Sequence, residues 1–263
     1  MTSRARHWPE FAIEAACLAV FMISACGFVT LLEHPSSPLR HAIASAVLRR
    51  VLTGIAMGLT AIGLIYSPWG QRSGAHMNPS LTLTYLRLRK IAAPDALGYV
   101  LAQFAGGFAG VVVARAVLGT AVADPAVRYA VTVPGPRGAA MAFAGELVIS
   151  FGMMLMVLLV SNSSLARFTG LFAGLLVAGY IGVEAPLSGM SMNPARTVGS
   201  AFHAGQWTAL WVYFTAPPLG MLAAAELYRR LPGAPQIFCA KLHHDNDKRC
   251  IFRCHYPKNR RTS

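Results

Sequence analysis

Two stretches of sequence decide the fold: SGAHMNPS at residues 73–80 and SGMSMNPAR at residues 188–196. In each stretch an Asn directly precedes a Pro. Asn is a preferred N-cap residue, and Pro suits the first turn of a helix. We therefore expect two short helices, one ending near Arg87 and the other near His203. A single Asn-Pro pair can also mark an ordinary turn. The prediction of two half-helices therefore depends on the pair occurring twice in matching surroundings.

Those surroundings are six apolar runs, each long enough to cross a bilayer of roughly 30 Å. Of the 263 residues, 55% are hydrophobic and only 13% are charged, whereas soluble domains carry about 25% charged residues. The runs cover residues 11–32, 43–66, 96–119, 139–160, 166–185 and 207–228. The two Asn-Pro segments, 73–90 and 188–205, are apolar but too short to span. The sequence predicts an all-α membrane protein with six transmembrane helices and two re-entrant half-helices.

The chain repeats this pattern once. Glu14 lies early in a first half of about residues 11–119, and Glu146 lies early in a second half of about residues 139–228. Because each half holds three spans, the two halves have opposite orientations in the membrane. Inverted repeats place a transport site near the midplane and build it from broken helices.

Basic residues predict the orientation. The net charge of +13 is concentrated at the two ends and in short loops, which indicates membrane topology rather than nucleic-acid binding. Sixteen Lys and Arg residues lie on the side of the termini and six on the other side, so both termini are predicted to be cytoplasmic. The predicted organisation is an N-terminus (1–10), a channel domain (11–228) and a basic tail (229–263) of a multi-pass protein of the cell membrane.

On these motifs the sequence resembles the aquaporin (major intrinsic protein) family over about residues 10–228. The resemblance implies a homotetramer in the lipid bilayer, one pore per subunit and no required cofactor. It places the pore centre at Asn78, Pro79, Ser80, Asn193, Pro194 and Ala195. Ser80 stands where the family usually has Ala, and we expect little change because Ser is nearly as small. Asn amides would donate to a passing water, and backbone carbonyls of residues 74–77 and 189–192 would accept from it.

The resemblance also implies a narrow selectivity filter in the outer part of the pore. Arg196 would line the filter and repel cations, since a buried Arg is otherwise costly in a membrane. The other filter positions fall on Met57, Ile181 and Met190. A shift of one residue would substitute Tyr180 for Ile181.

Acids inside the membrane have two interpretations. In the resembled family, residues like Glu14 and Glu146 accept hydrogen bonds from the backbone of the re-entrant loops, where no water is available. The alternative is proton-coupled transport, since intramembrane acids are functional by default. Glu184 lies near an outer helix end, where we expect it to be solvated.

The tail beyond residue 228 lies outside the resemblance. Thiol and imidazole side chains gather there within seventeen residues: Cys239, His243, His244, Cys250, Cys254 and His255. Such ligands at short spacings are typical of zinc sites, although Cys-x3-Cys-His is not a standard finger spacing. The other interpretation is a polybasic segment attracted to anionic lipid headgroups.

Together these features favour a passive channel for water that excludes ions and protons. Thr197 and the Leu210-Trp211 pair resemble water channels, but the Met and Ile of the filter replace the Phe and His of a strict water filter. We therefore expect some passage of other small neutral solutes. Three alternatives remain: a facilitator of glycerol, ammonia or hydrogen peroxide, an ion-coupled secondary transporter, and a metal sensor anchored by the pore fold. No nucleophile–base pair converges in the sequence, so an enzyme is not expected.

Overall fold

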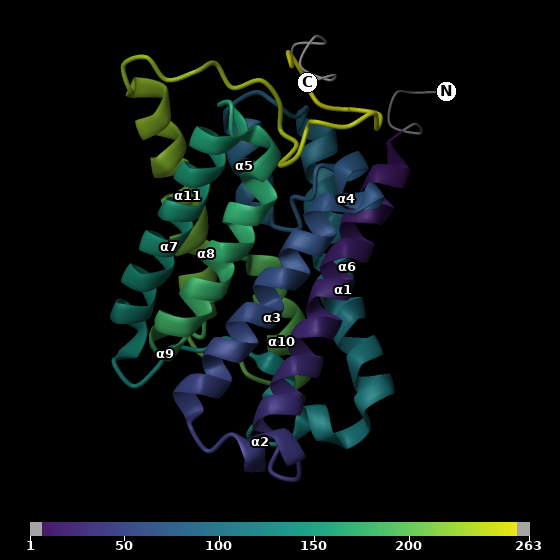
Figure 1. The fold of residues 1–263 in the computed structure, drawn as a ribbon, viewed down its shortest axis with the longest axis vertical. Coiled ribbons are helices and arrows are strands. Elements are labelled where there is room, and N and C mark those ends of the chain that lie inside the picture. Colours follow the sequence, from purple (N-terminus) through teal and green to yellow (C-terminus); the bar gives the residue numbers. More distant parts are fainter. Residues whose placement is uncertain (1–6, 257–263) are drawn as a thin grey trace.

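The computed structural model describes residues 7–256, and Figure 1 shows them as a bundle of helices. No strand occurs in this range, so the predicted all-α fold is confirmed. The long helices are α1 (Trp8–Glu33), α3 (Ala46–Tyr66), α6 (Ala93–Leu118), α7 (Gly138–Ser161), α8 (Thr169–Val183) and α11 (Leu210–Arg230). The orientation argument also counts basic residues within 1–6 and 257–263, which lie outside the described residues.

Five of these six helices are long and apolar enough to cross a membrane, when α8 is counted together with the turn η4 (Ala166–Phe168) that precedes it. The sixth, α11, has 21 residues but contains Pro217 and Pro218, and Glu226 further lowers its apolarity. It nevertheless packs along α7 in the way that α6 packs along α1. Its position therefore makes it the last helix of the second half. The predicted span 43–66 begins only at Ala46, because Pro38–Ala42 forms a separate short helix, α2.

The two half-helices are α5 (Pro79–Arg87) and α10 (Pro194–Ala204), close to the predicted bounds. Two short helices that the sequence did not predict, α4 (Pro68–Ser73) and α9 (Ala185–Ser188), lead into the loops before them. In Figure 1, α5 lies toward the end of the bundle that carries the termini, and α10 lies toward the other end. The half-helix α5 contacts α11, and α10 contacts α6. Each half-helix therefore packs against the last long helix of the other half.

Helices α3 and α8 join the halves through two facing glycines. A Cβ on Gly58 would lie 2.5 Å from the carbonyl oxygen of Gly174, and one on Gly174 would lie 2.6 Å from that of Gly58. Small residues permit such an approach, and close packing stabilises helix pairs in lipid.

We expect Gly58→Val to lower the thermal unfolding midpoint of the protein in detergent, because overpacking costs about 1–3 kcal/mol. Gly63→Val on the same helix is the matched control, since a Cβ at Gly63 would meet no described atom within 4 Å. Scanning fluorimetry of both variants measures the difference. Equal midpoints for the two variants would contradict the close approach.

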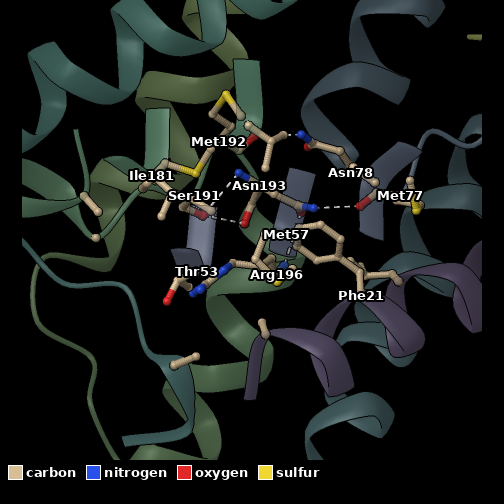
Figure 2. A pocket seen from close by; sticks show the side chains of 18 of the residues that line it. Phe21, Thr53, Met57, Met77, Asn78, Ile181, Ser191, Met192, Asn193 and Arg196 are labelled. Atoms are coloured by element: carbon tan, nitrogen blue, oxygen red, sulfur yellow. Dashed lines mark hydrogen bonds between the residues drawn. The ribbon is translucent and has the colours of Figure 1, made fainter. Parts of the chain in front are cut away.

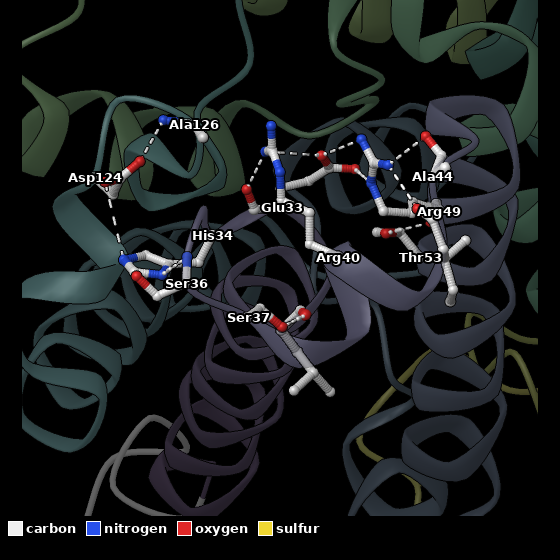
Figure 3. A network of polar contacts seen from close by, with 12 residues as sticks. Glu33, His34, Ser36, Ser37, Arg40, Ala44, Arg49, Thr53, Asp124 and Ala126 are labelled. Carbon is white, nitrogen blue, oxygen red and sulfur yellow. Dashed lines mark hydrogen bonds and ion pairs between the residues drawn. The ribbon is translucent and has the colours of Figure 1, made fainter.

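Polar contacts join several elements at the end of the bundle opposite the termini, where α2 lies (Figure 1), and Figure 3 shows these contacts from close by. Arg49 donates to both carboxylate oxygens of Glu33, at 3.1 Å and 3.0 Å, and Arg40 lies 3.7 Å from the same carboxylate. His34 lies 3.9 Å from Asp124. These contacts join α1, α2, α3 and the loop after η2 (Gly119–Ala123) around one mouth of the bundle.

Candidate functional site

A cavity of about 530 Å³ lies between the two halves and is lined mainly by apolar side chains. It extends from Glu33 at the C-terminal end of α1 to Leu242 of the tail. Its lining includes both Asn residues of the repeated motif and all four predicted filter residues: Asn78, Asn193, Met57, Ile181, Met190 and Arg196. Figure 2 shows most of these side chains around it. The other predicted centre residues, Pro79, Ser80, Pro194 and Ala195, are buried in the packing behind the wall.

Both Asn side chains cap the half-helices that follow them. The Oδ1 atom of Asn78 accepts from the Ser80 N–H at 2.8 Å. That of Asn193 accepts from the N–H groups of Ala195 and Arg196, at 3.1 Å and 3.2 Å. The capping fixes each side chain at the positive end of its helix dipole.

The same two side chains also fasten the loops to each other. Asn78 Nδ2 donates to the Met192 carbonyl oxygen at 2.7 Å, and Asn193 Nδ2 donates to that of Met77 at 2.6 Å (Figure 2). A side-chain amide has two N–H hydrogens, so each Asn keeps one donor for a molecule in the cavity. The carbonyls of residues 74–77 and 189–192, which we expect to accept from a passing water, include three that already accept one protein donor. Those of Met77 and Met192 accept from the Asn amides, and that of Gly74 accepts from the Leu242 N–H. A carbonyl oxygen has two lone pairs, so each keeps one acceptor position.

The loop backbones adopt matching left-handed conformations. Positive φ angles occur at three equivalent positions of each loop: Gly74, Ala75 and Met77, and Gly189, Met190 and Met192. For residues other than Gly this conformation costs roughly 1–2 kcal/mol each. The surrounding structure must therefore hold both loops in place.

Glu14 and Glu146 supply that restraint. Glu14 accepts from Ser73 Oγ at 2.7 Å and from the N–H groups of His76 and Met77 at 3.0 Å and 2.6 Å. Glu146 accepts from Ser188 Oγ at 2.6 Å and from the N–H groups of Ser191 and Met192, both at 2.7 Å. Each carboxylate thus satisfies backbone donors just before its Asn, in the same pattern in both halves.

The Glu184 side chain is more buried than the sequence indicated. We expect a solvated side chain from the sequence, but the side chain is buried, and its Oε2 lies 2.9 Å from Ser188 Oγ, beside Glu146. The burial depends on Gly145 of α7, where a Cβ would lie 2.5 Å from Glu184 Oε1. The sequence around residue 184 could not reveal this burial, because the glycine that permits it is on another helix.

Arg196 keeps its charge facing the cavity. Its Nη1 atom is buried and has no hydrogen-bond partner among residues 7–256. No carboxylate of that range lies within 4.0 Å of its guanidinium group. Figure 2 places Thr53 and Met57 beside it. Arg196 is therefore a partly buried cation in the wall of the cavity, and no carboxylate of residues 7–256 pairs with it.

Ile181 and Tyr180, the two candidates for one filter position, point in different directions. Ile181 lines the cavity, whereas Tyr180 points toward α7, where its Oη would lie 2.6 Å from a Cβ on Gly152. Phe21 and Thr53 also line the cavity and were not singled out from the sequence. Thr53 precedes Met57 by one helical turn, so the helix period could have identified it. No motif marks Phe21.

The structure brings together four of the six tail residues considered as metal ligands. The ligand atoms of Cys239, His244, Cys250 and Cys254 all lie within 4.8 Å of one another. His243 instead packs edge-on against Tyr66, and His255 Nδ1 lies 3.5 Å from Lys90 Nζ. The candidate metal ligands are therefore these four residues instead of the six that the sequence indicated.

Hydrogen bonding and burial shift the pKa values of the three thiols in this cluster in different directions. Hydrogen bonding from the Cys239 thiol lowers the pKa of Cys250 and of Cys254 below the ordinary thiol value. Burial raises the pKa of Cys239 itself. Desolvation also lowers the pKa of the nearby Lys90.

A family model and several known proteins match this chain. The family model described as "Major intrinsic protein" matches residues 2–228. The chain is 38% identical over 172 residues to "Aquaporin NIP3-1" of Zea mays, covering 64% of this chain and 55% of the relative. It is 37% identical over 181 residues to "Glycerol uptake facilitator protein-like 6" of Lactiplantibacillus plantarum, covering 65% and 81%. The chain spans little more than half the length of the plant relatives that it matches.

A solved structure has the same fold. The "aquaglyceroporin from Plasmodium falciparum" superposes with a TM-score of 0.73 at 20% identity, covering 86% of this chain and 96% of that one. With its repeated Asn-Pro turns and six long helices, the chain belongs to the major intrinsic protein family.

Proposed function

We propose that the protein is a passive channel for water that also leaks small neutral solutes and excludes ions and protons. The crossed Asn contacts carry the proposal. They leave one amide hydrogen of Asn78 and one of Asn193 for a molecule at the centre of the cavity. A water oxygen held by both donors turns its own hydrogens outward, toward the two mouths. The positive ends of α5 and α10 disfavour a cation or a proton at the same point.

The filter supports the second part of the proposal. Met57, Ile181 and Met190 surround Arg196 with apolar, largely flexible side chains. Met can adapt its shape to an irregular solute, and the unpaired guanidinium group of Arg196 supplies hydrogen-bond donors. This wall admits a small uncharged solute that has polar groups on one side, while the positive charge of Arg196 opposes cations.

The buried acids favour passive transport over an ion-coupled mechanism. The carboxylate oxygens of Glu14 and Glu146 accept from the loop donors described above. Protonation of either group would weaken the contacts that hold the left-handed loops. Their geometry therefore suits a structural role.

A facilitator of larger neutral solutes is the second candidate. One observation favours it, namely that the filter contains no aromatic ring and no His among its predicted positions. The same relative named for glycerol uptake matches much of the channel. The two candidates differ in the ratio of the rates for water and for glycerol.

We also propose that both termini face the cytoplasm and that the channel assembles as a homotetramer. The excess of basic residues at the tail-bearing end supports the orientation. Large apolar side chains are exposed on several long helices, including Leu59, Leu101, Val117 and Val148. These faces suit contact with lipid or with further copies of the chain.

Stopped-flow light scattering of reconstituted vesicles tests the proposal. A sucrose gradient should shrink vesicles that contain the channel faster than empty vesicles, and a glycerol gradient should then give slow re-swelling. Glycerol crossing as fast as water would support the facilitator instead. Rates equal to those of empty vesicles, even after removal of residues 236–263, would contradict both candidates.

Met190→Phe should reduce glycerol flux more than water flux. A rigid ring at the wall excludes a carbon chain before it blocks a single water molecule, whereas Met can move aside. Met141→Phe is the matched control, because Met141 is exposed on α7 and does not line the cavity. Paired water and glycerol rates for both variants measure the effect, and an equal reduction of the two fluxes would count against Met190 as a filter residue.

A further inference from the structure

The tail folds against the channel although it has no helix or strand within residues 231–256. Several of its side chains are nevertheless almost completely buried, among them Cys239, Ala240, Leu242 and Phe252. Short segments without regular secondary structure rarely bury enough apolar surface to hold a single conformation, and a bound metal is a common way to stabilise them. The tail therefore requires some further restraint.

Four side chains of the tail converge in a way that suits such a metal. The Sγ atoms of Cys239 and Cys250 lie 3.5 Å apart, and Cys254 Sγ lies 3.0 Å from His244 Nε2. Ligands at 2.0–2.3 Å from a tetrahedral centre lie about 3.3–3.8 Å from one another. All four atoms lie within 4.8 Å of one another, so shifts of about 1 Å would bring them to these separations. A disulfide would join only two of the three sulfurs and would not account for the imidazole.

The donor set indicates the class of metal. Three thiolates and one imidazole in tetrahedral arrangement form a typical structural zinc site. Zinc with three thiolates carries one net negative charge. Lys90, which is 8% exposed, lies close enough to Cys239 and Cys254 to interact with them electrostatically and can balance that charge.

The segment between these ligands sits on the first re-entrant loop. Leu242 N–H donates to the Gly74 carbonyl oxygen at 3.2 Å, and the Ala240 carbonyl oxygen lies 2.8 Å from His76 Nε2. The Phe252 ring stacks on the His76 ring, with centroids 5.3 Å apart and planes 12° apart. Figure 1 shows the tail crossing the end of the bundle that carries the termini. The tail therefore covers the mouth that leads to Asn78.

Leu242 reaches into the cavity itself. Within residues 231–256 it is the one residue that lines the cavity, and it is 5% exposed. It lies directly between Lys241, which is 2% exposed, and His243. The position of Leu242 thus depends on a segment flanked by two of the converging ligands, Cys239 and His244.

We propose that the tail binds one zinc ion through Cys239, His244, Cys250 and Cys254, and that the metal-bound tail is a lid which holds Leu242 in the cytoplasmic mouth of the pore. Loss of the metal releases the lid and opens that mouth. The metal site is independent of the proposed function, whereas the gating part rests on the channel conducting water.

Metal analysis tests the first part. Full-length protein purified without chelators should contain about one zinc per chain. The double variant Cys250→Ser with Cys254→Ser should lose it, and Cys17→Ser, which removes a buried thiol of α1, should keep it. Cobalt exchanged into the site should show thiolate-to-metal charge-transfer absorption. Protein that carries no zinc and takes up none when zinc is added would overturn the proposal, as would a Cys239–Cys250 disulfide in its place.

Water flux and proteolysis test the lid. Chelation, the double variant and Leu242→Ala should each raise the vesicle shrinkage rate by at least about fivefold, within the usual range of coupling between two sites. Leu242→Ala should still bind zinc. Trypsin should cut after the exposed Arg230 in every sample but after the buried Lys241 only when zinc is absent. Zinc-bound protein whose flux and Lys241 cleavage do not change on chelation would overturn the lid.

The two proposals fail in different ways. If protein lacking residues 236–263 conducts no more water than empty vesicles, the channel function fails. Zinc content and cleavage after Lys241 do not depend on transport, so they still decide whether the tail is a metal-bound lid.

Discussion

Replacing Arg196 with Val should leave the channel folded and permeable to water but allow small cations and protons to cross. Arg196 lines the cavity with its Nη1 atom buried, and its guanidinium group has no counterion among the described residues. A unit charge at about 4 Å opposes a cation by about 4 kcal/mol at an effective dielectric constant of 20. Since about 1.4 kcal/mol corresponds to a tenfold change, exclusion should weaken by on the order of a hundredfold or more.

Proton and potassium fluxes into vesicles, measured with internal fluorescent dyes, provide the readout. Arg196→Lys keeps the charge and should keep much of the exclusion. Arg167→Val removes an exposed charge outside the cavity and should change nothing. Vesicles with Arg196→Val that remain tight to ions would remove Arg196 from the filter.

Replacing Glu146 with Ala should abolish the folded channel. The change leaves the N–H groups of Ser191 and Met192 without their acceptor, whereas the Ser188 hydroxyl group can turn to Glu184. Each unsatisfied buried group costs about 1–3 kcal/mol, so the loss of about 2–6 kcal/mol is comparable with the whole stability of a marginally stable domain, about 5 kcal/mol. We expect aggregation in detergent instead of a monodisperse peak in size-exclusion chromatography.

Glu226→Ala is the matched control, because Glu226 pairs with Arg87 and Arg229 at the surface. Glu146→Gln keeps one acceptor oxygen and should have intermediate stability. A stable Glu146→Ala protein whose transport has merely lost a dependence on pH would instead support proton coupling.

The parts of the structure that follow from local chemistry could be predicted from the sequence. The half-helix α5 ends at Arg87 as expected, because an Asn cap and a following Pro define its start and a short apolar run sets its length. The pairing of the two halves was also predictable, since both carry the same pattern of acid, spans and Asn-Pro turn. The filter residue Ile181 was one of two choices, and helix rotation alone separates it from Tyr180.

Features that depend on distant contacts could not be predicted. The burial of Glu184 requires a glycine on another helix. The position of Leu242 in the cavity requires a tail without regular secondary structure to return to the first loop, more than 160 residues earlier, through contacts such as that between His76 and Ala240. Periodicity carries no information about such a return. Only the Cys and His residues of the tail indicated that this segment could form a defined structure.

The crossed amide contacts also bear on how the channel is made. While a ribosome synthesises the first half, the amide nitrogen of Asn78 and the carbonyl oxygen of Met77 lack the partners that they have in the folded protein, because Met192 and Asn193 are not yet present. At 5–20 residues per second the delay is roughly ten seconds. During that interval the first three spans can already be inserted in the bilayer with their loop incomplete. The middle of the conduit is therefore the last part to be assembled, and a nascent chain stalled before the second turn cannot form an open leak in its host membrane by this route.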